Sequence, residues 1–355
     1  MLRTRAFPLP WLLAASLFAL SGPLLADTST ATDLAGQLQV DNPDYLKGLQ
    51  RVAITSFSVQ VLTELKASEG GDISNLISGK PNEVSVTMTG HDDKQWPEIV
   101  DRYYQTLLQQ LQAAGIQVVS AEELQAMPEY KTVRDAGKTS PQLEDAKAGK
   151  GMYYGVTTVP MLIQNEQQVF RKSLFSGQGP DDPYMTFGSR FASGFNTGAA
   201  QQAEFALAKK LNAHVLKVRF TVVPALLTTS KDFWSGTSVD SKAALSLPGY
   251  VNRFVLYSPT GDQSKISLKA AVASSEPVGE MKDTTSSAGT ALRTANMVGG
   301  MALGFLTGGI AGALKTGGTV SRDYALSVDS KRFNDMLQQE LSRTSAAFVG
   351  QLKQN

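Results

Sequence analysis

The sequence predicts an α/β (α+β) fold: a mixed β-sheet packed by helices, with an added antiparallel hairpin region and a glycine-zipper apolar segment near the C-terminus. Three observations predict this class. Residues 51–62, RVAITSFSVQVL, carry apolar side chains on both faces, as a central strand does. Residues 84–89 alternate apolar and polar side chains, which is typical of a half-buried strand. Residues 96–114 change to a helical period with one apolar stripe: Trp96, Ile99, Tyr103, Leu107 and Leu111.

The N-terminus has the features of a secretory signal peptide. Arg3 and Arg5 precede an apolar core, and small residues precede a cleavage position after Ala26. We therefore expect residues 1–26 to direct export to the periplasm and to be removed. Residues 27–50, rich in Thr, Asp and Gln, are predicted to form a flexible leader.

An exported α/β domain is expected over residues 51–292. Within it we predict long loops at 129–150 and 176–196, a Thr/Ser-rich linker from 275, and a hairpin about the turn at 259–262. Local signals mark helix ends: Gly115 is a C-cap candidate, and Ser120 with Glu123 is typical of a capping box.

The chain is predicted to end with a strand and an amphipathic helix over residues 319–355. The helix has one apolar face: Phe333, Leu337, Leu341, Phe348 and Leu352.

Composition excludes several functions. The 33 basic and 32 acidic residues leave a net charge of +1, so no bulk field favours nucleic acid. The absence of cysteine excludes disulfides and thiolate metal sites. Neither a G-x-S-x-G elbow nor an S-x-x-K motif occurs. We therefore expect no catalytic constellation, no enzyme activity and no cofactor.

The two histidines offer little for metal binding. His91 stands beside Asp92 and Asp93, an arrangement interpreted as a solvated turn, with a metal site as the alternative. His214 opens a strand and is interpreted as structural. We expect no metal site.

The most distinctive stretch is the glycine-rich apolar segment 293–318, which is uncharged from Thr294 to Leu314. Four glycines recur at every fourth position, along one line of a helix: Gly300, Gly304, Gly308 and Gly312. Each interior glycine costs about 0.5–1 kcal/mol relative to alanine, and close packing in lipid or in an oligomer offsets that cost. The segment therefore predicts membrane attachment or self-association; packing on the protein's own sheet and an ordinary loop remain alternatives.

A second candidate lies in the expected 176–196 loop, where aromatic side chains are spaced by three or four residues: Tyr184, Phe187, Phe191 and Phe195. These residues would cover a groove for an apolar ligand, or anchor a partner or membrane interface. The alternative is that they seal the domain's core.

Three stretches carry a family resemblance: RVAITSF at 51–57, VDRYYQTLLQQLQAAGIQVVSAEELQAM at 100–127, and AEFALAKKLNAHVLKVRFTVV at 203–223. This pattern resembles the periplasmic α/β domain shared by the amino-terminal domain of TolB and the curli-assembly protein CsgG. The resemblance implies an envelope-associated, non-enzymatic scaffold or assembly component that forms oligomers.

The sequence thus predicts a non-enzymatic exported cell-envelope protein, located in the periplasm and associated with a membrane. Its expected partners are further copies of itself, membrane lipid and other envelope proteins, with no nucleic acid. The alternative function is a periplasmic binding module for an apolar ligand, with the 176–196 loop as its lid.

Overall fold

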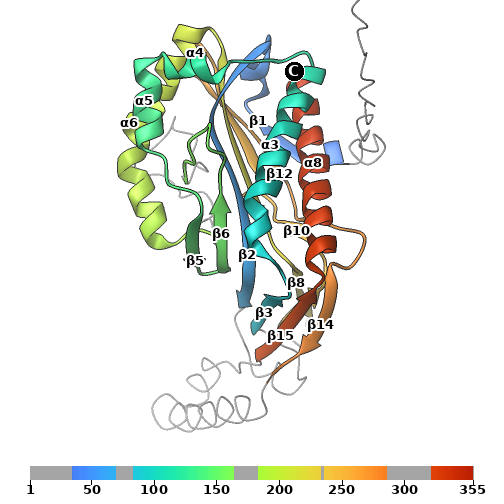
Figure 1. Ribbon diagram of the computed structural model, residues 1–355. Coiled ribbons are helices and arrows are strands. Elements are labelled where there is room, and N and C mark those ends of the chain that lie inside the picture. The colour runs from blue at the N-terminus through green and yellow to red at the C-terminus, as the bar shows by residue number, and fades with distance from the viewer. Residues whose placement is uncertain (1–33, 69–82, 164–182, 233–235, 286–320, 355) are drawn as a thin grey trace, which may run out of the picture.

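The computed structural model describes residues 34–68, 83–163, 183–232, 236–285 and 321–354 (Figure 1). The predicted fold class is confirmed, because a mixed sheet is packed by helices on both faces. Helices α3 (Trp96–Ala113) and α8 (Ser330–Gln354) cover one face of the sheet. The other face carries α4 (Ala121–Gln125), α5 (Pro128–Asp135) and α6 (Phe187–Leu211).

The sheet is organised around β2 (Arg51–Ser68), an 18-residue strand. Strands lie in the order β1 (Leu38–Asp41), β12 (Gln263–Leu268), β11 (Arg253–Tyr257), β7 (His214–Val222), β2, β3 (Glu83–Thr89), β15 (Ser321–Val328) and β14 (Gly279–Asp283). The pairs β2–β7 and β3–β15 are parallel, whereas the other neighbours in this order are antiparallel.

Shorter elements complete the fold. Strands β4 (Gln117–Val118) and β6 (Gly149–Tyr154) pair with β2, and β5 (Gln142–Ala146) pairs with β6. Two separate ribbons are formed by β8 (Leu226–Asp232) with β9 (Gly236–Lys242), and by β10 (Ser246–Leu247) with β13 (Val272–Ala273). Two short 3₁₀ helices are η1 (Pro43–Leu46) and η2 (Asp93–Gln95).

The larger apolar core lies between the sheet and the α3–α8 pair. Aromatic rings from three elements meet there: Phe220 lies 6.1 Å from Phe254 and 5.7 Å from Phe348, between ring centroids. Tilted and edge-on pairs at such distances add to the energy of burial. A smaller core lies between the sheet and α4–α6, and it includes Leu207, Val215 and Tyr257.

The strongly periodic helices match the sequence. All five residues of the stripe predicted on α3 are buried, as are the five predicted on α8. Gly115 ends α3 at a φ of +80°, and two hydrogen bonds of 2.9 Å close the helix, from Gly115 N–H to Gln112 O and from Ile116 N–H to Leu111 O. This is the Schellman arrangement that a C-cap glycine permits.

The capping box at α4 is only half formed. Ser120 Oγ accepts a hydrogen bond from Glu123 N–H at 3.2 Å, as predicted. The Glu123 carboxylate instead receives two bonds from Arg51, of 2.8 and 2.6 Å. A charge-assisted contact with β2 therefore replaces the expected local bond.

The prediction of a flexible leader over residues 27–50 is wrong for residues 34–50. Strand β1 pairs with β12, and the side chains of Leu34, Leu38 and Leu46 are buried. Local composition suggested a polar leader, but a few buried leucines are enough to hold this segment on the sheet when an edge strand supplies partners for its backbone hydrogen bonds.

The predicted loops are also corrected. Residues 129–150 form most of α5, β5 and the start of β6, because Tyr130 and Val133 bury one side of an otherwise charged helix. Residues 187–196 begin α6, so only the earlier part of the 176–196 loop lies outside that helix. The aromatic spacing of three or four residues is itself helical. Strand β14 lies in the expected linker from 275.

Candidate functional site

Two polar regions of the fold are candidates for function, and the first lies at one end of the sheet. Ser68 pairs with Glu83, Glu83 pairs with Ser321, and Asp283 pairs with Tyr324. The connections 69–82 and 286–320 therefore both join the sheet at this end, which lies beyond α3 and α8 in Figure 1. We call the ends of β2, β3, β15 and β14 at this position the sheet end.

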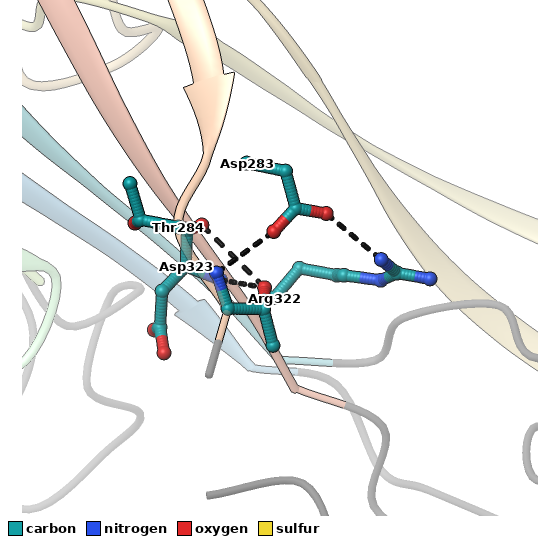
Figure 2. Close-up of polar contacts among 5 residues, drawn as sticks. Asp283, Thr284, Arg322 and Asp323 are labelled. Atoms are coloured by element: carbon teal, nitrogen blue, oxygen red, sulfur yellow. Dashed lines mark hydrogen bonds and ion pairs between the residues drawn. The ribbon is translucent and has the colours of Figure 1, made fainter. Parts of the chain in front are cut away.

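A polar clamp holds the two ends of the 286–320 connection together (Figure 2). Arg322 donates a hydrogen bond of 2.8 Å to the Asp283 carboxylate. The backbone N–H and hydroxyl of Thr284 donate to Asp323 O at 2.8 and 3.1 Å, and Asp323 N–H donates to Thr285 Oγ1 at 3.0 Å. Backbone and side chains therefore continue the β14–β15 pairing beyond the last strand residue.

The clamp is linked to β3, and its contacts favour the charged form of Asp283. Ser85 Oγ donates to the Asp323 carboxylate at 2.6 Å. Contacts with the side chain and backbone N–H of Thr285, together with Arg322, hold the pKa of Asp283 below its ordinary value. Because the Asp283–Arg322 pair is about 40% exposed on both sides, it adds little stability by itself. The pair therefore positions the chain at the two ends of the connection 286–320.

The glycine-zipper residues themselves, Gly300, Gly304, Gly308 and Gly312, lie outside the described residues. The structure describes where the connection that contains them, 286–320, leaves β14 and rejoins β15. Among the described helices, none has both the length and the apolar character needed to cross a membrane.

The second region is a buried row of polar side chains on the face of the sheet beneath α6. Lys217 on β7 lies 3.2 Å from the Glu204 carboxylate of α6, and Thr55 donates to the same carboxylate at 2.7 Å. The side chains of Lys217 and Glu204 are only 3% and 0% exposed. The Lys217 ammonium also lies 5.8 Å from the centre of the Tyr257 ring. Because the pair is buried, removing either partner is expected to lower the stability of the protein.

The row continues along β7 toward β11. Arg219 donates to the Tyr153 hydroxyl and to the Met185 sulfur at 3.2 Å, and it stands opposite Arg253 in the strand register. The next polar residue on this face, Thr221, donates to Gln60 at 3.1 Å. Chemically, the row offers buried cations and amide groups, which attach α6 and residues 183–186 to the sheet.

Sequence reasoning missed this row, although a signal was present. In HVLKVRFTV, the strand at 214–222, Lys217, Arg219 and Thr221 occupy alternate positions of an otherwise apolar run. That alternation indicates one polar face, and every residue of the strand is nevertheless buried. Only the tertiary structure shows which partners compensate the charges.

Of the four aromatic candidates, Tyr184 precedes α6 and the other three belong to that helix. Tyr184 is half-buried, and its backbone oxygen accepts a hydrogen bond of 3.1 Å from Gln60. Phe187, Phe191 and Phe195 belong to α6, and their side chains lie outside the described residues.

The histidines occupy structural positions. The ring of His91 stacks on Trp96 with 5.3 Å between centroids. A ring nitrogen of His214 lies 2.9 Å from Tyr45 O, and burial lowers the pKa of His214. No group of three or more His, Asp or Glu side chains suited to a metal ion occurs within the described ranges.

Comparison of the chain with protein-family models, with curated proteins and with solved structures gave no match. The resemblance to the TolB and CsgG domain therefore stays a prediction from the sequence.

Proposed function

We propose that this protein is a non-enzymatic exported scaffold of the cell envelope that attaches to a membrane through the glycine-rich segment 293–318. The observation that carries the proposal is the position of the described residues that flank the connection 286–320, which contains this segment. They continue from β14 and β15, which are neighbouring antiparallel strands tied by the clamp at Asp283, Thr284 and Arg322. A segment held in this way leaves the domain and returns to the same side. It therefore suits a helix in the membrane plane or a hairpin, and not a single crossing.

The described surface supports the same assignment. Among the described residues, only Leu143 and Tyr250 are large hydrophobic side chains with marked exposure, at 49% and 51%, and they lie on different elements. Scattered single residues of this kind do not form an attachment surface. Apolar contact with lipid would therefore have to come from residues such as those of 293–318.

The alternative function has less support. A binding module for an apolar ligand would need an apolar surface beneath the 176–196 loop. Residues 187–196 are helical, and the described residues before them are already packed on the domain: Met185 lies in a buried apolar cluster with Tyr153, Met161 and Ile163, and Tyr184 packs against the main core.

The test is alkaline extraction of envelopes from cells that make the protein with or without residues 295–314. The deletion keeps β14, β15 and the clamp, so the domain is expected to stay folded. The intact protein is expected to resist extraction, and the deletion variant to be released as a folded soluble domain. Release of both proteins would contradict membrane attachment and leave self-association, which chemical crosslinking of the intact protein would detect.

Point variants refine the test. Gly304→Leu and Gly308→Leu place a large side chain on the glycine line and are expected to abolish association through that line, seen as loss of crosslinking between copies, without unfolding the domain. Met301→Leu, in the same segment but off that line, conserves volume and serves as the matched control. Loss of the fold in the glycine variants would instead indicate that the segment packs on its own domain.

A further inference from the structure

One face of the sheet is open to solvent at the sheet end. Strand β3 alternates buried and more exposed side chains, and Val84, Val86 and Met88 lie in the main core. The intervening side chains of β3 and their register partners therefore lie on the opposite face. Helix α6 covers β7 and β11, and Figure 1 shows α4–α6 away from β3, β15 and β14. We call this exposed part of the sheet the open face.

The open face consists of small polar and charged side chains in aligned rows. In the central row, Thr87 of β3 stands between Glu64 of β2 and Ala325 of β15, and Ala325 stands opposite Lys282 of β14. All four residues are exposed or half-buried. The rows on either side contain residues of the same kind: Lys66, Ser85, Asp323 and Thr284 in one, and Thr89, Ser327 and Glu280 in the other.

Opposite charges stand at the two ends of the central row. Glu64 and Lys282 are three strand spacings apart, which is about 14 Å. The residues between them, Thr87 and Ala325, are short enough for a second sheet to pack on this face at the ordinary distance of about 10 Å. The Glu64 carboxylate also lies 3.5 Å from Lys66, but its side chain is 33% exposed and stays accessible from the open face.

Symmetry decides how a second copy of the chain would fit this row. In a two-fold dimer with the sheets face to face, the axis lies between the sheets and runs either along the strands or across them. An axis along the strands turns the row around, so that Glu64 of each copy faces Lys282 of the other. An axis across the strands places each residue of the row opposite itself. Because like charges directly opposite each other are destabilising, the row favours the axis along the strands.

The neighbouring charges favour the same axis. Lys66 lies on the β2 side of the open face, whereas Asp323 and Glu280 lie on the β15–β14 side. The axis along the strands packs the β2 side of one copy on the β15–β14 side of the other, which again brings opposite charges close. The axis across the strands would pack each side on itself.

The position of the connection 286–320 agrees with this choice of axis. It leaves β14 and rejoins β15 at the sheet end. An axis along the strands leaves the sheet ends of both copies pointing in the same direction, so both connections can reach one membrane. An axis across the strands would direct them to opposite sides of the dimer. The charges and the connection therefore select the same arrangement independently.

The size of the open face sets the strength of the contact. Four strands at about 4.8 Å and the seven residues of β3 at about 3.3 Å give a face of about 440 Å² in each copy. Stable interfaces bury about 800 Å² per partner. The open face is therefore suited to a weak contact, which forms when a second attachment concentrates the copies on one surface.

We propose that the open face is an interface between two copies of this chain, related by a two-fold axis along the strands and formed on a membrane. The inference rests on the proposed function for the membrane that concentrates the copies, while the contact itself is made by described residues of the folded domain. It adds a partner, the second copy, and two residues that select its orientation, Glu64 and Lys282.

Single-cysteine crosslinking tests the interface, because the chain contains no cysteine. Thr87→Cys places one thiol on the open face, close to the proposed axis. The mature variant is mixed with phosphatidylethanolamine/phosphatidylglycerol vesicles and treated with a short bismaleimide, and a crosslinked dimer is expected. Gln105→Cys is the matched control, because Gln105 is exposed on α3, which packs on the other face of the sheet. This control is expected to stay monomeric.

Charge reversal tests the orientation. In the Thr87→Cys protein, Lys282→Glu is expected to lower the yield of dimer by about tenfold, because both contacts with Glu64 become repulsive. Adding Glu64→Lys restores opposite charges across the axis and is expected to restore the dimer. Circular dichroism during urea unfolding shows whether each variant keeps the fold. An unchanged yield in Lys282→Glu, or no recovery in a folded double variant, would overturn the proposed orientation.

Cosedimentation with the vesicles, measured on the same samples, separates this inference from the proposed function. Protein that binds vesicles without a Thr87→Cys crosslink would overturn the interface and leave membrane attachment intact. Equal crosslinking of Thr87→Cys and Gln105→Cys would also overturn the interface, because crowding on the vesicle would then explain it. Crosslinking of Thr87→Cys in protein that does not bind vesicles would support the interface and contradict attachment. Protein that neither binds nor crosslinks would overturn both proposals.

Discussion

The buried pair Lys217–Glu204 is predicted to control how firmly α6 is held on the sheet. Lys217→Met keeps most of the side-chain volume but removes the cation that lies 3.2 Å from the buried Glu204 carboxylate, which Thr55 also contacts at 2.7 Å. Removing one partner of a buried pair costs about 3–5 kcal/mol, because the other charge stays out of water. With a urea m-value of about 3 kcal/mol/M, the unfolding midpoint is expected to fall by about 1–1.7 M.

Two further variants give this prediction its controls. Lys210→Met, also on α6, breaks a partly exposed pair with Glu129 of α5 and is expected to leave the urea midpoint nearly unchanged. Replacing both buried partners, Glu204→Leu with Lys217→Met, is expected to restore stability to within about 1 kcal/mol of the wild type, because neither charge remains. Circular dichroism during urea titration measures all of these.

The reasoning would be refuted by either of two results. One is a Lys217→Met midpoint shift no larger than that of Lys210→Met, since burial would then make no difference. The other is a double variant that loses the sum of the two single losses, because partners in direct contact should not behave additively.

Three further predictions concern stability, each measured by urea unfolding. Gly149→Ala is expected to lower the free energy of unfolding by about 3 kcal/mol or more, because the φ of Gly149 is +144° and an added Cβ would lie 2.0 Å from Glu64 O. As its control, Gly350→Ala lies inside α8 with open space around it and should raise the free energy of unfolding by about 0.5–1 kcal/mol. Burial lowers the pKa of His214, so as the pH falls the unfolded chain takes up the proton before the folded protein does. Stability is therefore expected to fall as the pH drops below about 6.5 and through the folded pKa. His214→Asn should reduce this pH dependence. Ser120→Ala is expected to cost about 1 kcal/mol through loss of the α4 cap, whereas an unchanged midpoint would show that the cap contributes nothing.

The parts of the fold that could be predicted are those with a strong local period. The apolar stripe of α3, the face of α8 and the alternation in β3 each repeat over two or more turns or strand pairs, so no distant contact is needed to recognise them. The elements that were missed have sparse local signals. Strand β1 has only four residues, and its pairing with β12 joins segments more than two hundred residues apart.

The candidate site, too, could be predicted only where it leaves a local pattern in the sequence. The glycine line and the aromatic spacing are visible in the sequence, but the predicted loop at 176–196 is wrong where residues 187–196 begin α6. The buried row was visible only as the alternation of Lys217, Arg219 and Thr221 on β7. Its compensating partners, Glu204 on α6 and Tyr153 on β6, come from other elements, so local pattern could not supply them.

The sequence by itself determined which stretches form helices and strands wherever burial imposes a regular period, and it located the glycine-rich segment. Only the tertiary structure decided which elements are neighbours. Strand β15 lies parallel to β3 with Ser321 opposite Glu83, and α8 packs on α3. Backbone hydrogen bonds between strands are alike for most sequences, so pairing partners are selected by packing of the whole core. That selection brings both ends of 286–320 to one end of the sheet.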